Sequence, residues 1–151
     1  MGEYHRIAKI MNERFGQNEL IGLATKNGDK IANRIVCAYY ENESFYVITY
    51  SLSDKMKQIT IEPNIAICTL DWFTGNGLGE NLGWVCDERN TVLMEKLRAV
   101  FSSWYSTCGH VDESDHNTCI LRIRLSDGLL IEHKGNMKIY NHIDFNNKKI
   151  V

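Results

Sequence analysis

The sequence predicts a mainly β domain of the α+β class, built as an antiparallel barrel with a few peripheral helices. Runs of β-branched and aromatic residues separated by turn residues cover most of the chain, whereas a helical repeat of apolar residues occurs in only three segments. An open antiparallel sheet would leave two unpaired edges, so we expect the strands to close. The 151 residues contain no linker or internal repeat and therefore predict one domain, 1–151.

Three segments carry the helical pattern. The first covers 3–15, and the second begins after Ser53, a good N-cap residue, and stops before Pro63. The longest helix is expected over 91–106. We expect these helices to connect or cover strands rather than to pack as a bundle.

The remaining apolar runs predict strands joined by short turns. Asn27 and Gly28 form a strong hairpin signal. The glycine-rich segment 74–83 predicts a turn, a bulge or a close backbone approach, and a turn at 126–128 opens the last hairpin. Strands are expected near 20–26, 31–40, 44–50, 65–73, 82–86 and 119–125, followed by two in the last hairpin.

Composition excludes several kinds of partner. A net charge of -2 predicts no nucleic-acid or anionic-membrane surface, and no run approaches the roughly 18 apolar residues of a membrane span. The start of the chain has no apolar core of signal-peptide length, so we expect a cytoplasmic protein. An odd, widely spaced set of cysteines indicates free thiols in a reducing compartment: Cys37, Cys68, Cys86, Cys108 and Cys119.

The junction between the strand 44–50 and the second helix combines groups that suit a phosphate. A helix N-terminus favours an anion, Ser53 adds a hydroxyl, and Lys55 and Lys57 add positive charge. An alternative interpretation is that Ser53 caps its own helix, Asp54 complements the helix dipole and the lysines are solvated. Local chemistry leaves both interpretations open.

The block from 20 to 73 resembles the FMN-binding split barrels of the pyridoxamine 5′-phosphate oxidase-like superfamily, and in particular its small general-stress-protein-like members. The shared pattern is a strand, a turn glycine, a strand with Arg-x-Val, an acidic turn, a strand ending in Thr, and Ser-x-Lys opening a helix before Pro-Asn. The segment HNTCILRIRLSDGLLIEHKG is similar to the family's last strands. This resemblance implies a six-stranded Greek-key split β-barrel and a homodimer with FMN at the subunit interface.

The resemblance also implies a phosphate site. Arg34 would contact the phosphate side of FMN, Ser53 and Lys55 would hold the phosphate, and Lys57 is a weaker candidate. Asp54 departs from the more basic family pattern and lowers the positive charge at this position.

Four further residues would contact the flavin itself. Ile35 and Val36 would lie along the cofactor, and Thr49 would meet the ring or its ribityl chain. Trp72 would lie near the cofactor of the partner subunit, although a tryptophan of the core or interface is the alternative.

The implied function is an FMN-dependent oxidoreductase with an unidentified small-molecule substrate or reductant. The arginine-rich substrate motif of true pyridoxamine phosphate oxidases is absent from 136–151, so vitamin B6 oxidation is not expected. A non-catalytic protein that stores or senses a flavin or a heme is the alternative. No side chain stands out as a catalytic acid, base or nucleophile.

A second group of residues has the chemistry of a metal site without its spacing. Cys108, His110, His116 and Cys119 supply four soft ligands within twelve residues. Their spacing matches no paired zinc knuckle, and Cys119 begins an apolar strand. We therefore predict no metal site.

Overall fold

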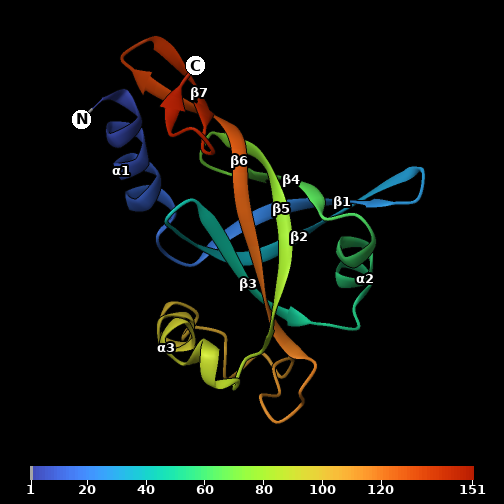
Figure 1. Cartoon of the computed structure of the whole chain (residues 1–151). Coiled ribbons are helices and arrows are strands. Elements are labelled where there is room, and N and C mark those ends of the chain that lie inside the picture. Colours follow the sequence, from blue (N-terminus) through green and yellow to red (C-terminus); the bar gives the residue numbers. More distant parts are fainter. Residues whose placement is uncertain (1) are drawn as a thin grey trace.

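Six antiparallel strands close into a barrel in the computed structural model, which describes residues 2–151 (Figure 1). The order around the barrel is β1-β2-β3-β6-β5-β4, and β7 and β8 extend the sheet from β6. The mainly β class and the six-stranded closure are therefore confirmed. The strands are β1 (Glu19–Asn27), β2 (Lys30–Glu41), β3 (Ser44–Tyr50), β4 (Asn64–Thr69), β5 (Phe73–Trp84), β6 (Thr118–Lys134), β7 (Met137–Asp144) and β8 (Lys149–Ile150).

The helices lie around the barrel. They are α1 (Glu3–Phe15), α2 (Asp54–Ile61), the short 3₁₀ helix η1 (Glu88–Asn90) and α3 (Thr91–Val100). None of the helices within residues 2–151 is long and apolar enough to cross a lipid bilayer. The predicted third helix ends at Val100, six residues earlier than expected, and continues as a series of turns.

Two apolar cores hold these elements together. α1 contributes Ile7, Met11 and Phe15, one on each successive turn, to the core that the barrel encloses. The Phe15 ring lies 6.0 Å from the rings of both Phe45 and Phe73. The smaller second core contains the buried face of α3 together with residues of β3 and β6.

β4 and β5 differ from their predicted bounds. The strand expected over 65–73 stops at Thr69, and a turn containing Trp72 in a left-handed conformation (φ 57°) leads into β5. The glycine-rich segment 74–83 is itself strand. A Cβ at Gly79 would lie 2.8 Å from Ile59 of α2, so the glycine allows the helix to pack closely on β5.

The turn predicted at 126–128 is wrong, because β6 runs unbroken through it. Asn76 pairs with Asp127 and Gly77 pairs with Leu125, so Ser126 is the extra residue of a β-bulge. The extra residue shifts the alternation of the strand by one. Odd-numbered residues face the core before the bulge and even-numbered residues face it afterwards, as the buried Leu125 and Leu130 show.

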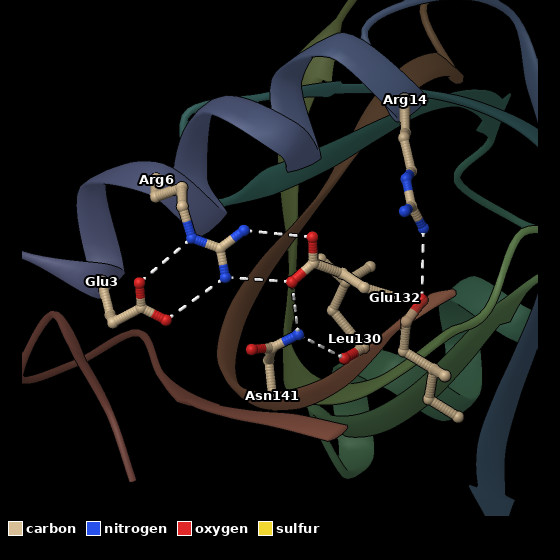
Figure 2. A network of polar contacts seen from close by, with 7 residues as sticks. Glu3, Arg6, Arg14, Leu130, Glu132 and Asn141 are labelled. Atoms are coloured by element: carbon tan, nitrogen blue, oxygen red, sulfur yellow. Dashed lines mark hydrogen bonds and ion pairs between the residues drawn. The ribbon is translucent and has the colours of Figure 1, made fainter. Parts of the chain in front are cut away.

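A polar network attaches α1 to the β6–β7 hairpin (Figure 2). Arg6 donates two hydrogen bonds of 3.0 Å to Glu132 and also pairs with Glu3. Asn141 donates to a Glu132 oxygen and to the carbonyl of Leu130, both at 3.1 Å. Hydrogen bonding to Arg6 lowers the pKa of Glu132, whose side chain is buried.

Candidate functional site

The predicted junction lies where the barrel splits. β2 and β3 pair with each other only through 39–41 and 44–46. Among residues 2–151, no strand pairs with the edge of 30–38 that faces away from β1, or with the edge of 47–50 that faces away from β6. α2 begins four residues after β3 ends, beside this opening (Figure 1).

Arg34 points to the inner side of β2 and is held in place by hydrogen bonds to neutral groups. Its Nη1 donates to the Leu23 carbonyl at 3.2 Å and to Thr25 Oγ1 at 2.8 Å, and its Nη2 donates to Gln58 Oε1 at 3.2 Å. Three of its five N–H groups are used, which leaves two for a ligand. Burial lowers the pKa of Arg34, and the nearby charge of Asp54 opposes this shift.

Lys55 supplies a second cation at the same place. Burial and the charge of Arg34 both lower the pKa of Lys55, so the two side chains are close enough to repel each other. Burial raises the pKa of the Cys119 thiol, and the positive charge of Lys55 opposes this rise. Cys119 is the strand partner of Thr49. Within the part of the chain that the structure describes, neither cation forms an ion pair with a carboxylate.

Ser53 occupies the N-cap position of α2 without capping the helix. Its backbone is extended (φ −69°, ψ 158°), as a cap requires, but its hydroxyl makes no capping hydrogen bond. Ser53 Oγ is buried and has no hydrogen-bond partner among the described residues. An unsatisfied buried hydroxyl costs about 1–3 kcal/mol, and an anion that accepts a hydrogen bond from it would remove this cost.

Two neighbouring side chains contribute less to this site. Lys57 is exposed on the first turns of α2. Asp54 is also exposed, and its negative charge raises the pKa of Arg34 against the effect of burial. The cluster of Arg34, Ser53 and Lys55, which we call the phosphate seat, therefore has positive charge on its buried side and one carboxylate on its exposed side.

The residues predicted to line the flavin fall on two faces of the barrel. Arg34 and Val36 share the inner side of β2, and Val36 packs on the core. Ile35 points to the opposite side because successive residues of a strand alternate, and it is 66% exposed. Thr49 is half-buried on β3. A single chain thus brings Val36 and Thr49, but not Ile35, to the side of the phosphate seat.

Trp72 lies at the other end of β4 from the phosphate seat. The six residues of β4 separate its turn from the end of α2, a span of about 20 Å. The indole is 47% exposed, with the ring of His133 centred 4.7 Å away and Lys138 Nζ 5.1 Å from the indole centroid. One chain alone does not bring Trp72 to the seat.

Two residues of the site were not among the predicted ones. Thr25 is only 2% exposed, accepts a hydrogen bond from Arg34 and donates to Gln58 Oε1 at 2.6 Å. The hairpin signal could have identified Thr25, because its register pairs Leu23 with Arg34 and brings Thr25 to the same face. Nothing in the sequence distinguishes Gln58 from any other polar residue on an amphipathic helix.

The four candidate metal ligands have separate environments. Cys119 faces the core, and the imidazole of His116 stacks on Trp84 with ring centres 3.8 Å apart. Cys108 Sγ accepts a hydrogen bond from the backbone of His110. Among residues 2–151, no three His, Cys, Asp or Glu side chains come together as a metal site would require.

Several solved structures share this fold over nearly the whole chain. General stress protein 26 from Bacillus anthracis str. Sterne superposes with a TM-score of 0.65 at 17% identity, over 89% of this chain and 98% of that one. A putative pyridoxamine 5′-phosphate oxidase from Listeria innocua gives 0.62 at 12% identity, over 85% and 98%. A pyridoxamine 5′-phosphate oxidase-related, FMN-binding protein from Nostoc punctiforme PCC 73102 gives 0.61 at 16% identity, over 100% and 95%. No family model and no curated protein matches the sequence.

Proposed function

We propose that this chain, which has the split-barrel fold of the pyridoxamine 5′-phosphate oxidase-related proteins, binds FMN through the phosphate seat and acts as an oxidoreductase on a small molecule. The main support is twofold: the buried Ser53 hydroxyl, two residues before Lys55, has no hydrogen-bond partner among the described residues, and neither Arg34 nor Lys55 forms an ion pair there. Solved neighbours described as FMN-binding and FAD-binding proteins support a flavin as the ligand.

The seat suits a phosphate monoester. Ser53 Oγ would donate one hydrogen bond, the two unused N–H groups of Arg34 would donate two more, and Lys55 would supply a nearby charge. Lys57 would add a weaker, solvated charge. Thr25 and Gln58 would keep the guanidinium of Arg34 in position through the hydrogen bonds that they already make.

A second copy of the chain would complete the flavin site. The outer side of β1 and β2 exposes Leu20 (49%), Ile31 (74%) and Ile35 (66%), more apolar surface than a solvated strand pair usually carries. We infer that this face is buried in a homodimer. The partner subunit's Ile35 and the partner subunit's Trp72 would then contact one side of a cofactor held between the subunits, with Val36 and Thr49 of the first subunit on its other side.

A bound flavin would supply the hydride or electron transfer. The chain would contribute binding and shielding: the seat fixes the phosphate, and the apolar strand faces exclude water from the ring. We infer that pyridoxamine phosphate is not the substrate, because 136–151 lacks the arginine-rich motif expected for it. The five free cysteines favour a reducing, cytoplasmic location.

The visible spectrum of the purified protein, followed by titration with FMN and with riboflavin, tests this proposal. Lys55→Ala should weaken the binding of FMN by tenfold or more and the binding of riboflavin by less than twofold, because only FMN has the phosphate. Lys9→Ala, which removes an exposed lysine of α1, is the charge-matched control. Equal weakening of both ligands by Lys55→Ala would place the phosphate elsewhere.

Two other outcomes decide between classes of function. Bound flavin that bleaches with a nicotinamide donor supports the oxidoreductase, whereas flavin that no donor reduces supports storage or sensing. A Soret band, or a colourless protein that does not bind added FMN, would refute the proposal.

A further inference from the structure

A hollow of about 570 Å³ lies on the outer side of the sheet, across β1 from the phosphate seat, and has no role in the proposed binding of the phosphate. It lies among β1, β4, β5 and β6, and we call it the β5–β6 hollow. Its volume is in the range of small-molecule sites. Thr25, whose side chain bonds Arg34 and Gln58 in the seat, also lines the hollow, so β1 alone separates the two sites.

The bulge at Ser126 creates the polar wall of this hollow. Because the bulge shifts the alternation of β6, Asp127 lies on the outer side, directly opposite Asn76 of β5. Asn76 Nδ2 donates to Asp127 Oδ1 at 2.9 Å, and Ser126 Oγ lies 3.2 Å from Asp127 Oδ2. Neutral donors thus fix the orientation of the carboxylate.

This wall accepts more hydrogen bonds than it donates. A carboxylate has about four acceptor positions, and Asn76 uses one of those on Asp127. Ser126 Oγ uses at most one more, because its single proton is shared with the Asn76 carbonyl, 3.1 Å away. The Asn76 amide donates through its nitrogen, which leaves its oxygen free as another acceptor. A ligand that carries two N–H donors on one planar group, such as an amidinium, would match this arrangement.

The charge around Asp127 favours a cation. Among the described residues Asp127 forms no ion pair, and its strand partner on β7 is another carboxylate, Asp144. Lys26 is the one basic residue that lines the hollow, and its positive charge contributes to lowering the pKa of Glu62. The Asp127 carboxylate is therefore left without a neutralising partner.

The rest of the lining is small and apolar. Ala24, Ala66 and Gly77 form part of it, with Ile31 at the β1–β2 hairpin, which is exposed in the single chain and borders the proposed dimer face. A Cβ at Gly77 would lie 2.4 Å from the Arg124 carbonyl oxygen, so this position does not accept a larger side chain. Such a surface suits the flat apolar body of a small ring or short alkyl group.

We propose that the β5–β6 hollow is the substrate subsite of the flavin centre and that it binds a small organic cation, an amine or amidine on an apolar body, through Asp127 and Asn76. This inference rests on the proposed function for the role of substrate, and on the hollow alone for the class of ligand.

Benzamidine is a suitable probe, because its planar amidinium carries parallel N–H groups and its ring is apolar. Benzamide, which has the same shape without the charge, is the matched ligand control. Binding of each to the FMN-loaded protein is measured by calorimetry, and perturbation of the flavin absorbance reports proximity to the cofactor. Benzamidine should bind at least tenfold more tightly than benzamide, and it should perturb the flavin spectrum.

Asp127→Asn should weaken the binding of benzamidine about tenfold and leave the affinity for FMN within twofold of that of the unsubstituted protein. Asp29→Asn removes an equal charge from the exposed β1–β2 turn and should change neither affinity. Equal binding of the two probes, or an Asp127→Asn protein that binds benzamidine normally, would overturn the inference while FMN binding stands.

The proposed function can fail separately from the ligand class. If the protein does not bind FMN, the substrate role is refuted together with the proposed function. Titration of the ligand-free protein with benzamidine, followed by the amide NMR signals of Asn76 and Gly77, then tests the ligand class. Shifts confined to these signals and their neighbours support a cation site in the hollow, and shifts elsewhere refute it.

Discussion

Replacing Ser53 with alanine should stabilise the ligand-free protein and weaken its binding of FMN. The Ser53 hydroxyl is buried and makes no hydrogen bond, so the substitution removes an unsatisfied polar group and breaks no contact. The cost of such a group is about 1–3 kcal/mol, and we expect an increase of about 1 kcal/mol in the free energy of unfolding. In a chain of this length that corresponds to a rise of about 2–4 °C in Tm.

Urea denaturation and FMN titration of the same variant measure the two effects. Loss of one hydrogen bond to a charged phosphate should weaken FMN by about tenfold, which is 1.4 kcal/mol. Ser51→Ala is the matched control, because the Ser51 hydroxyl does make a hydrogen bond, 2.8 Å from Asn117 Oδ1. It should destabilise the protein by about 1 kcal/mol.

The opposite result would refute this reasoning. If Ser53 capped α2 in solution, Ser53→Ala would destabilise the protein by about 0.5–2 kcal/mol, as the loss of an N-cap does. A destabilised Ser53→Ala protein with unchanged FMN affinity would therefore restore the simpler interpretation, a capped helix with solvated lysines.

Other predictions concern the fold. Arg6→Ala leaves the buried Glu132 without its ion-pair partner, so it should lower the free energy of unfolding at neutral pH by about 2 kcal/mol, as measured by urea denaturation. Lys9→Ala is the control, because it removes an exposed lysine of the same helix and should have little effect. Arg6 lowers the folded-state pKa of Glu132 below its ordinary 4.5, so this stabilisation is present above pH 4.5 and is lost as the pH falls through the folded-state pKa. Glu132→Gln should therefore flatten the decline in stability at acid pH. An unchanged decline would contradict this role of Glu132. Gly77→Ala would bring a Cβ within 2.4 Å of a backbone oxygen and should cost about 1–3 kcal/mol, and a neutral effect would mean that the bulge can relax.

Much of the barrel could be predicted because its signals are local. Asn27 and Gly28 fix the first hairpin, and a stop at Pro63 ends α2. The bulge at Ser126 could not be found in the same way. Ser126-Asp127-Gly128 has turn composition, but a Cβ at Gly128 would lie 2.6 Å from the ring of Phe73, so the glycine is required by packing against a distant strand.

The site was predictable in its residue types and only partly in its geometry. The charges of Arg34 and Lys55 act on each other and Ser53 is two residues before Lys55, but the binding of a phosphate by these residues stays a proposal. The orientation of Ile35 follows from strand alternation and needed only the register of β2. The missing hydrogen bond of Ser53 depends on how α2 is placed against the barrel, which no local pattern specifies.

The closing pair of strands has a consequence for how the chain folds. β3 pairs with β6 from Ser44 with Arg124 to Tyr50 with Thr118, so the partners are roughly 70 to 80 positions apart in the sequence. The β1–β2–β3 meander forms from near neighbours and leaves one edge of β3 open until β6 arrives. Closure of this long loop should limit the refolding rate, and the yield of refolded protein should fall as its concentration rises, because another chain can pair with the same edge.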